Sequence, residues 1–348
     1  MSDRKILWTG AELMDHEFPP VPWIVDGLVT AGLTLLVGAP KLGKSWLVLQ
    51  MAYAVSVGGA VLGKIRVPRH DALLISLEDT PRRLQTRLTD IGATSSDRLH
   101  VAFEWPPGID GGAWLRQWFE RVPETKLVII DTWGKYAGLR DLNDYSETTR
   151  AAAALKTIAD EHDAAIIAVH HTRKGVALDF LESSLGSTGL TGAADTVLVL
   201  KRARGNRDAT LSVVGRDVEE AEFALSFDGE LKTWRLLGTT GEVQESDARQ
   251  AIVDTLSEGG AMTPKAVAEA LDRNYNTIKT HMRRMAEDGT LTSLSGVYTC
   301  CNPCKPVTPV ISVTPEVTRV TEVTRVTGVT EFTKNTQETP KSDHKELF

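Results

Sequence analysis

Eight consecutive residues combine glycine, lysine and serine at a spacing that suits phosphate binding. They match the pattern G-x-x-x-x-G-K-S and read Gly38, Ala39, Pro40, Lys41, Leu42, Gly43, Lys44 and Ser45. The glycines let backbone N–H groups approach phosphate oxygens, Lys44 can reach the β- and γ-phosphates, and the Ser45 hydroxyl can ligate Mg²⁺. The stretch therefore predicts a binding site for ATP, or another nucleoside triphosphate, with Mg²⁺.

The segments on either side of this loop support the prediction. An apolar run at 33–37 precedes the loop and is typical of a buried strand, and residues 46–52 have helical character. The helix N-terminus adds a positive dipole end that favours an anion. Trp46, the first residue after the motif, is counted with it as a nucleotide-binding residue. The alternative is a glycine-rich turn that matches by chance, and the flanking strand and helix argue against it.

Two further apolar runs end in carboxylates. Residues 71–77 lead to Glu78 and Asp79, and residues 126–130 lead to Asp131. Ligands of open α/β sheets bind at the carboxyl ends of strands, so Glu78 is a catalytic candidate and Asp131 a candidate for holding Mg²⁺. Asp79 or Thr80 can also cap the helix that follows, which is compatible with a catalytic Glu78.

A pair of histidines follows another predicted strand. His170 and His171 come after the apolar run 164–169. Zinc binding would require further ligands, and none is evident nearby in the sequence. A sensor of the γ-phosphate or a hydrogen-bonded histidine is the preferred interpretation of His171.

Strands that alternate with helices predict an α/β fold with a mostly parallel central sheet. Two runs at 223–227 and 231–236 read as an antiparallel hairpin at one edge. Residues 133–148 are expected to form a polar loop. The predicted organisation is an N-terminal arm at 1–30, an ATPase domain at 31–236, a linker at 237–246, a small domain at 247–300 and a disordered Val-Thr-rich tail at 301–348.

The small domain shows the order of a winged helix-turn-helix. Helical segments at 248–256, 264–271 and 275–285 precede a hairpin at 290–298. In the third helix Lys279, Arg283 and Arg284 would face outward and could contact duplex DNA. Six Lys and Arg against seven Asp and Glu at 247–300 make a weak electrostatic footprint. Docking of another protein therefore stays open as the alternative.

Composition excludes several classes of protein. The chain has 348 residues, enough for about two domains, and its net charge of −7 argues against a generally basic nucleic-acid binder. It contains no run of 18 apolar residues, so no membrane span is expected and a cytoplasmic location is predicted. The three cysteines, Cys300, Cys301 and Cys304, form no disulfide framework and are expected to be free thiols.

These motifs together resemble the RecA-fold hexameric P-loop ATPases, most closely the AAA-type, RepA-like replicative-helicase ATPases of plasmids and phages. The resemblance covers about residues 20–236. Beside the phosphate motif it rests on the segments 76–79, 127–131, 170–174, 186–195 and 214–216. It implies an ATP-hydrolysing motor, assembled as a homo-oligomeric ring, that acts on single-stranded DNA.

The resemblance also implies roles for individual residues. Glu78 would polarise the attacking water, His171 would sense the γ-phosphate, and Arg216 would act as a finger in the neighbouring subunit's site. Loops at 135–140 and 175–192, with Lys135 and Arg140, would line the DNA channel. Two alternatives remain: a filament-forming recombination mediator, and a nucleotide-switched DNA-binding regulator.

Overall fold

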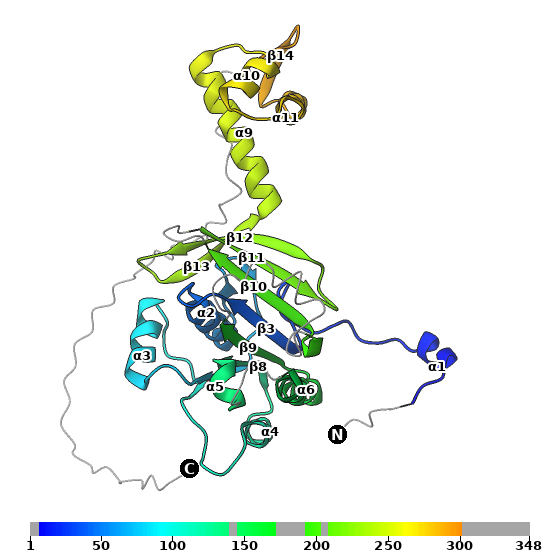
Figure 1. Cartoon of the computed structure of the whole chain (residues 1–348), viewed down its shortest axis with the longest axis vertical. Helices are drawn as coiled ribbons and strands as arrows, with labels where there is room; N and C mark the ends of the chain where they lie inside the picture. Colours follow the sequence, from blue (N-terminus) through cyan, green and yellow to red (C-terminus); the bar gives the residue numbers. More distant parts are fainter. Residues whose placement is uncertain (1–6, 139–144, 172–191, 203–207, 301–348) are drawn as a thin grey trace, which may run out of the picture.

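The computed structural model describes residues 7–138, 145–171, 192–202 and 208–300. Its centre is a nine-stranded sheet with the order β13-β12-β11-β10-β3-β9-β8-β6-β7 (Figure 1). Arg140, nearly all of the expected channel loop at 175–192, and the tail at 301–348 with Cys301 and Cys304 lie outside the described residues. The strands of this sheet are β3 (Gly32–Gly38), β6 (Asp71–Ser76), β7 (Leu99–Ala102), β8 (Thr125–Asp131), β9 (Ala165–His171), β10 (Thr196–Arg202), β11 (Asp208–Gly215), β12 (Ala221–Asp228) and β13 (Thr233–Thr239).

The sheet is parallel except at one edge. Six neighbouring strands pair in parallel, so their carboxyl ends all lie at the same end of the sheet. They are β10, β3, β9, β8, β6 and β7. Strands β11, β12 and β13 continue the sheet in antiparallel pairs. This arrangement confirms the predicted α/β fold with a mostly parallel sheet and an antiparallel hairpin, β12–β13, at the edge.

Helices cover both faces of the sheet, because alternate residues of each strand point to opposite sides. In β3, Leu36 belongs to one core cluster, and Leu35 and Val37 belong to the other. A parallel sheet buried on both faces is continuously apolar, as these strands are. The first face carries α2 (Lys44–Val57) and α3 (Pro81–Asp90), and the second carries α4 (Gly111–Arg121), α5 (Trp133–Ala137) and α6 (Tyr145–His162).

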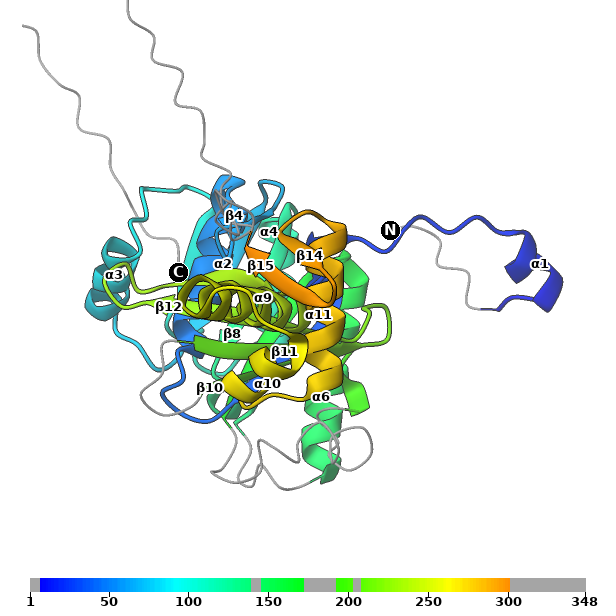
Figure 2. The same cartoon turned by 90° about the horizontal axis from the view of Figure 1, so that it is seen from above.

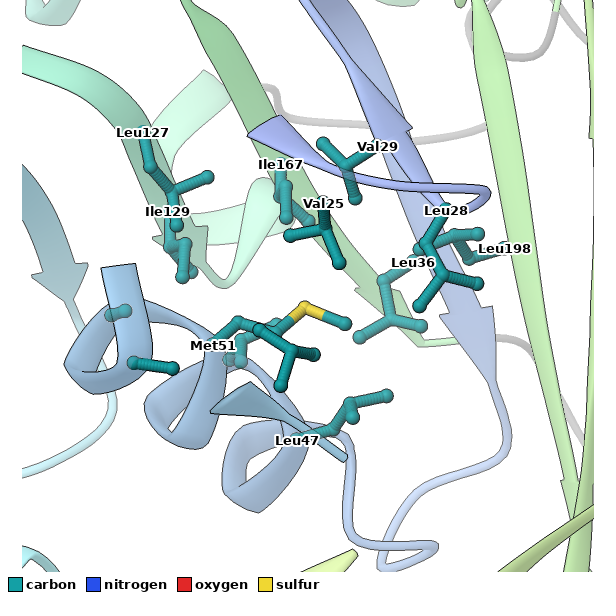
Figure 3. Close-up of a cluster of buried hydrophobic side chains, with 14 of the residues drawn as sticks. Val25, Leu28, Val29, Leu36, Leu47, Met51, Leu127, Ile129, Ile167 and Leu198 are labelled. Carbon is teal, nitrogen blue, oxygen red and sulfur yellow. The ribbon is translucent and has the colours of Figure 1, made fainter. Parts of the chain in front are cut away.

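The core beneath α2 holds the phosphate-binding motif against the sheet. Leu47 and Met51 of α2 face the sheet, where they meet side chains of four neighbouring strands (Figure 3). All are essentially excluded from solvent. The residues of the nine-stranded sheet labelled in this cluster are Leu36 of β3, Leu127 and Ile129 of β8, Ile167 of β9 and Leu198 of β10.

The N-terminal arm divides into two parts. Strands β1 (Trp23–Val25) and β2 (Val29–Thr30) form a small hairpin, whose Val25 and Leu28 are fully buried in the same cluster (Figure 3). Helix α1 (Gly10–Asp15) has no buried residue and lies away from the sheet in both views (Figures 1 and 2). Only the second half of the expected arm therefore packs on the core.

Two segments differ in local structure from the sequence expectations. The expected polar loop at 133–148 includes helix α5, where Trp133 is fully buried, and the start of α6 at Tyr145. Residues 237–246, expected as a linker, comprise the end of β13 and the start of α9 (Thr240–Gly259), where Thr239 and Glu242 form a capping box. The elements β7, α4 and the short hairpin β4–β5 (Ala60–Val61, Ile65–Arg66) had not been predicted.

Helix α9 leads away from the sheet to a small helical unit with its own core (Figure 1). The expected stripe on the third helix is confirmed, since Ile278, Met282 and Met285 are fully buried. No described helix has the length and apolar character needed to cross a membrane. The remaining elements of the unit are α10 (Pro264–Ala270), α11 (Tyr275–Glu287), β14 (Leu291–Leu294) and β15 (Val297–Cys300).

Candidate nucleotide-binding site

Strand pairing brings the predicted site residues together at the carboxyl ends of the parallel strands. Gly38, the last residue of β3, is paired with His171 of β9. Asp131 of β8 is paired with Ser76 of β6, two residues before Glu78. Because β9 lies between β3 and β8 and these strands are parallel, motifs far apart in the sequence meet here.

The phosphate-binding motif forms a tight loop between β3 and α2. Helix α2 begins at Lys44 with Gly43 as its N-cap, and no side chain caps its backbone N–H groups. Uncapped N–H groups at a helix N-terminus bind anions well, aided by the helix dipole. The Lys44 ammonium donates hydrogen bonds to the carbonyl oxygens of Gly38 at 2.6 Å and Ala39 at 2.9 Å. The motif is therefore built to hold phosphates.

Two glycines of the motif are required by its geometry. Gly43 has φ +101°, a conformation that other residues rarely adopt. A side chain at Gly38 would place its Cβ 2.6 Å from the backbone oxygen of Leu200 in β10. Any larger residue at Gly38 would separate β3 from its neighbouring strand.

Lys44 is buried beneath the loop, and its surroundings shift its pKa in opposite directions. Burial lowers the pKa of Lys44 to about 8, although the carboxylates of Asp131 and Glu78 raise it in part. An added phosphate would favour the charged form further. The lysine can thus supply a positive charge to a bound phosphate chain at neutral pH.

Asp131 and Ser45 fit the requirements of a magnesium site. Asp131 is 5% exposed, and its Oδ1 atom is buried without a hydrogen-bond partner. Burial raises the pKa of Asp131, and the nearby Ser45 hydroxyl offsets this in part. A buried carboxylate oxygen beside a hydroxyl is the oxygen-donor chemistry that Mg²⁺ prefers. These two residues would hold the ion, as the sequence predicted.

The structure separates the roles of the adjacent acidic residues Glu78 and Asp79. Glu78 faces the site, where its Oε1 accepts a hydrogen bond from the Thr132 hydroxyl at 3.2 Å. Asp79 points to α3 and forms ion pairs with Arg87 at 2.5 Å and Arg83 at 3.4 Å. Thr80, not Asp79, caps α3, because its hydroxyl accepts from the Arg83 backbone N–H. Of the two carboxylates, Glu78 is therefore the one that lies beside Thr132 and His171 at the site.

The two histidines occupy different environments. His170 is largely enclosed, and burial lowers its pKa to about 4, so it stays neutral. His171 lies at the site, with its Nε2 atom 3.9 Å from Glu78 Oε2 and its buried Nδ1 atom without a partner. Burial, chiefly, and the nearby Lys44 charge lower the pKa of His171. A neutral imidazole can act as a hydrogen-bond sensor at this position.

Arg216 lies far from the phosphate loop of its own chain. It follows Gly215, which pairs with Thr196 at the amino end of β10. Its Nη2 atom donates to the Gly192 carbonyl oxygen at 3.0 Å, and its Nη1 atom lies 3.7 Å from Asp195. The side chain is 59% exposed. Arg216 therefore lies at the amino ends of the parallel strands, whereas the phosphate-binding loop lies at their carboxyl ends.

The expected nucleic-acid contacts are dispersed. Lys135 lies on α5, not on a loop, and its ammonium donates to the Leu77 carbonyl oxygen at 2.9 Å. On α11, Lys279 lies over the Tyr275 ring, Arg283 pairs with Glu287 at 3.4 Å, and Arg284 lies 4.0 Å from a carboxylate of α9. All three cationic side chains of α11 remain exposed, as predicted.

Two residues of the site had not been predicted from the sequence. Thr132, which directs Glu78, directly follows Asp131 and could have been found by its place at a strand end. Trp234 donates a hydrogen bond from its indole Nε1 to the Gly43 carbonyl oxygen at 3.0 Å, although 191 residues separate the two. No local sequence pattern predicts the contact between Trp234 and Gly43.

This fold and this site define a P-loop ATPase. The profile of a family described as AAA domain (AAA_25) matches residues 3–177, which is half of the chain. The protein belongs to this AAA domain family.

Two solved structures are similar to the chain. The "ATPase Domain of G40P" has a TM-score of 0.45 and 18% sequence identity, covering 59% of this chain and 84% of that one. The KaiC-like protein PH0186 from Pyrococcus horikoshii OT3 has a TM-score of 0.42 and 16% identity, covering 62% and 95%.

Proposed function

We propose that this P-loop ATPase works as a homo-oligomeric ring, hexameric as in the family it resembles, that uses Mg²⁺-ATP to move along single-stranded DNA. The position of Arg216 carries the proposal. Among the described residues, the polar contacts of Glu78 and Asp131 include no arginine, whereas hydrolysis of this kind commonly uses one to stabilise transition-state charge.

Head-to-tail assembly would supply that arginine from a second copy of the chain. Arg216 lies at the amino ends of the parallel strands and the phosphate-binding loop lies at their carboxyl ends. In a head-to-tail assembly, one surface of each protomer would therefore face a different surface of the next. Such heterologous contacts close into rings when the rotation per subunit allows it. Glu78, Thr132 and His171 would then act on water and the γ-phosphate in one chain, with Arg216 contributed by its neighbour.

A complementation experiment tests the shared site. Arg216→Ala and Glu78→Gln should each lose hydrolysis and keep ATP binding. Mixed in one ring, some interfaces combine an intact Glu78 with an intact Arg216, so activity should partly return. Absence of rescue at every mixing ratio, with assembly confirmed by electron microscopy, would refute the shared site. Arg69→Ala is the matched control, because Arg69 is 56% exposed, pairs with surface Asp97 at 3.3 Å and donates to the Ser56 carbonyl oxygen at 3.4 Å, away from Glu78 and Arg216.

The DNA-directed part of the proposal has its own test. Single-stranded DNA should stimulate ATP turnover more than duplex DNA of the same length, and the native protein should displace a paired strand. Equal turnover with and without DNA would leave an ATPase that acts on another substrate.

One observation favours a nucleotide-switched DNA-binding regulator as the second candidate. Helix α9 continues directly from β13, the strand whose Trp234 contacts the phosphate loop. In this proposal α10, α11 and the β14–β15 hairpin form a winged helix that binds duplex DNA. Duplex affinity that changes between ADP and a non-hydrolysable ATP analogue would support the regulator over the motor.

A further inference from the structure

Trp234 belongs to β13, the outer strand of the sheet, and contacts the phosphate-binding loop. Its side chain is fully buried, and its indole N–H donates to the carbonyl oxygen of Gly43 at 3.0 Å. The ring also packs directly on Gly43, because a Cβ atom built there would lie 3.0 Å from Trp234 Cζ2. This contact reaches the turn that begins helix α2.

The position of Trp234 is itself defined by several neighbours. The Gln50 side-chain amide pairs with the Trp234 backbone, donating to its carbonyl oxygen at 3.0 Å and accepting from its N–H at 3.1 Å. The Arg202 guanidinium lies over the indole, 5.3 Å from the ring centroid, and the Phe227 ring lies 5.0 Å away. Because Gln50 belongs to α2, the indole and the phosphate loop are held to the same helix.

The hydrogen bond to Gly43 constrains the amide group that follows it. In a trans peptide the C=O and N–H groups point in opposite directions, so fixing the Gly43 oxygen also fixes the direction of the Lys44 N–H. The Gly43 oxygen also accepts from the Leu47 N–H at 3.1 Å, within the first turn of α2. The Lys44 N–H is one of the free donors at this helix N-terminus.

We propose that Trp234 is a positioning residue for the phosphate site, holding the Gly43–Lys44 peptide so that its N–H points at a bound diphosphate or triphosphate. The ligand class is defined by the loop, and the inference requires only that the protein is a P-loop ATPase. It does not depend on a ring or on DNA. Trp234 acts through the backbone and touches no reacting atom.

Substitution of Trp234 by Phe tests the proposal, because it keeps an aromatic ring and removes the N–H donor together with part of the indole, a truncation that the control below reproduces. Affinity for ADP should fall by about three- to tenfold, the range for loss of one neutral hydrogen bond. Inorganic pyrophosphate, which lacks base and sugar, should lose competition with fluorescent ADP by the same factor. For ATP turnover, KM should rise by that factor with little change in kcat, because the contact exists in ground and transition states alike.

Trp118→Phe is the matched control. The Trp118 indole also donates one hydrogen bond, to the Thr125 hydroxyl at 3.1 Å, on the opposite face of the sheet. Both variants should lower the melting temperature, but only Trp234→Phe should weaken binding of ADP and pyrophosphate. If Trp234→Phe does not fold, Gln50→Leu serves instead, with a smaller loss of affinity in the same direction.

Three outcomes would overturn the inference. In the first, the folded variant binds ADP within twofold of the native protein. In the second, ADP binding weakens and pyrophosphate binding does not, which would place the effect at the nucleoside. In the third, Trp118→Phe weakens ADP as much as Trp234→Phe does, which would make the effect one of general stability.

Discussion

The hydroxyl of Thr132 donates a hydrogen bond to Oε1 of Glu78 at 3.2 Å, joining the ends of two adjacent strands. Thr132 is 5% exposed, so the donor is held in place while Glu78 remains accessible. His171 lies 3.9 Å from the other carboxylate oxygen. The Thr132 hydrogen bond therefore orients the Glu78 carboxylate, as a group that activates water requires.

Glu78→Gln should leave ATP binding intact and lower hydrolysis by about 10²-fold or more, the usual scale for loss of a general base. Asp79→Asn is the matched control, because Asp79 pairs with Arg87 and Arg83 on α3. It should lower stability and retain turnover. Steady-state ATPase assays alongside nucleotide titrations check both variants, and a silent Glu78→Gln with an inactive Asp79→Asn would reverse the assignment.

Asp131→Asn should abolish Mg²⁺-dependent turnover and yet raise the free energy of unfolding without nucleotide, on the order of 1 kcal/mol. The reason is that burial raises the pKa of Asp131 above its unfolded value, so the charge destabilises the fold at pH 7. Below the unfolded pKa both states are protonated, and the difference from the native protein should disappear. Urea titrations at pH 7 and near pH 3 measure this.

Asp195→Asn provides the opposite case for the same experiment. Asp195 is also buried, at 8% exposed, but it accepts hydrogen bonds from Lys156 at 2.6 Å and from the Leu33 N–H at 3.0 Å. Breaking a paired buried charge costs about 3 kcal/mol or more, so this variant should be less stable. Equal effects of the two substitutions would show that Asp131 is not an uncompensated charge.

Binding of ADP without Mg²⁺ should be coupled to proton uptake above pH 7. Burial holds the pKa of Lys44 at about 8, and an adjacent phosphate raises it again. At pH 8 about half a proton should be taken up per site, while at pH 6.5 Lys44 is already charged and uptake should vanish. Calorimetry in buffers of different ionisation enthalpy measures the proton count. A binding enthalpy independent of the buffer at pH 8 would contradict the prediction.

The C-terminal unit can be tested independently of the ATPase site. Replacing Lys279, Arg283 and Arg284 with Ala should weaken duplex binding and flatten its salt dependence by up to about 0.9 log units per lost phosphate contact. Basal ATPase activity should barely change, because α11 lies at the far end of α9. The control is Lys265→Ala on α10, a side chain 79% exposed. Unchanged affinity and salt slope would indicate that this unit binds protein.

The placement of the site motifs on strands and helices was predictable from the sequence. Gly38–Ser45 is contiguous, and its flanking strand and helix have their own apolar patterns. Asp131 and Glu78 could be assigned to strand ends because short apolar runs define where buried strands stop. The stripe of Ile278, Met282 and Met285 followed from helical periodicity in the same way. Such features depend on neighbours within about one turn or one strand.

Only the tertiary structure decided which residues meet across the chain. The contrast between Glu78 and Asp79 depends on packing of α3, and Trp133 turns an apparent loop into a helix because it is buried. Arg216 lies at the end of the sheet opposite the phosphate-binding loop, because β11 runs antiparallel to β10 and ends beside its amino end. The bond from Trp234 to Gly43 spans 191 residues. Contacts at such separations leave no periodic pattern in the sequence, because they are created only when the sheet assembles and brings distant strands together.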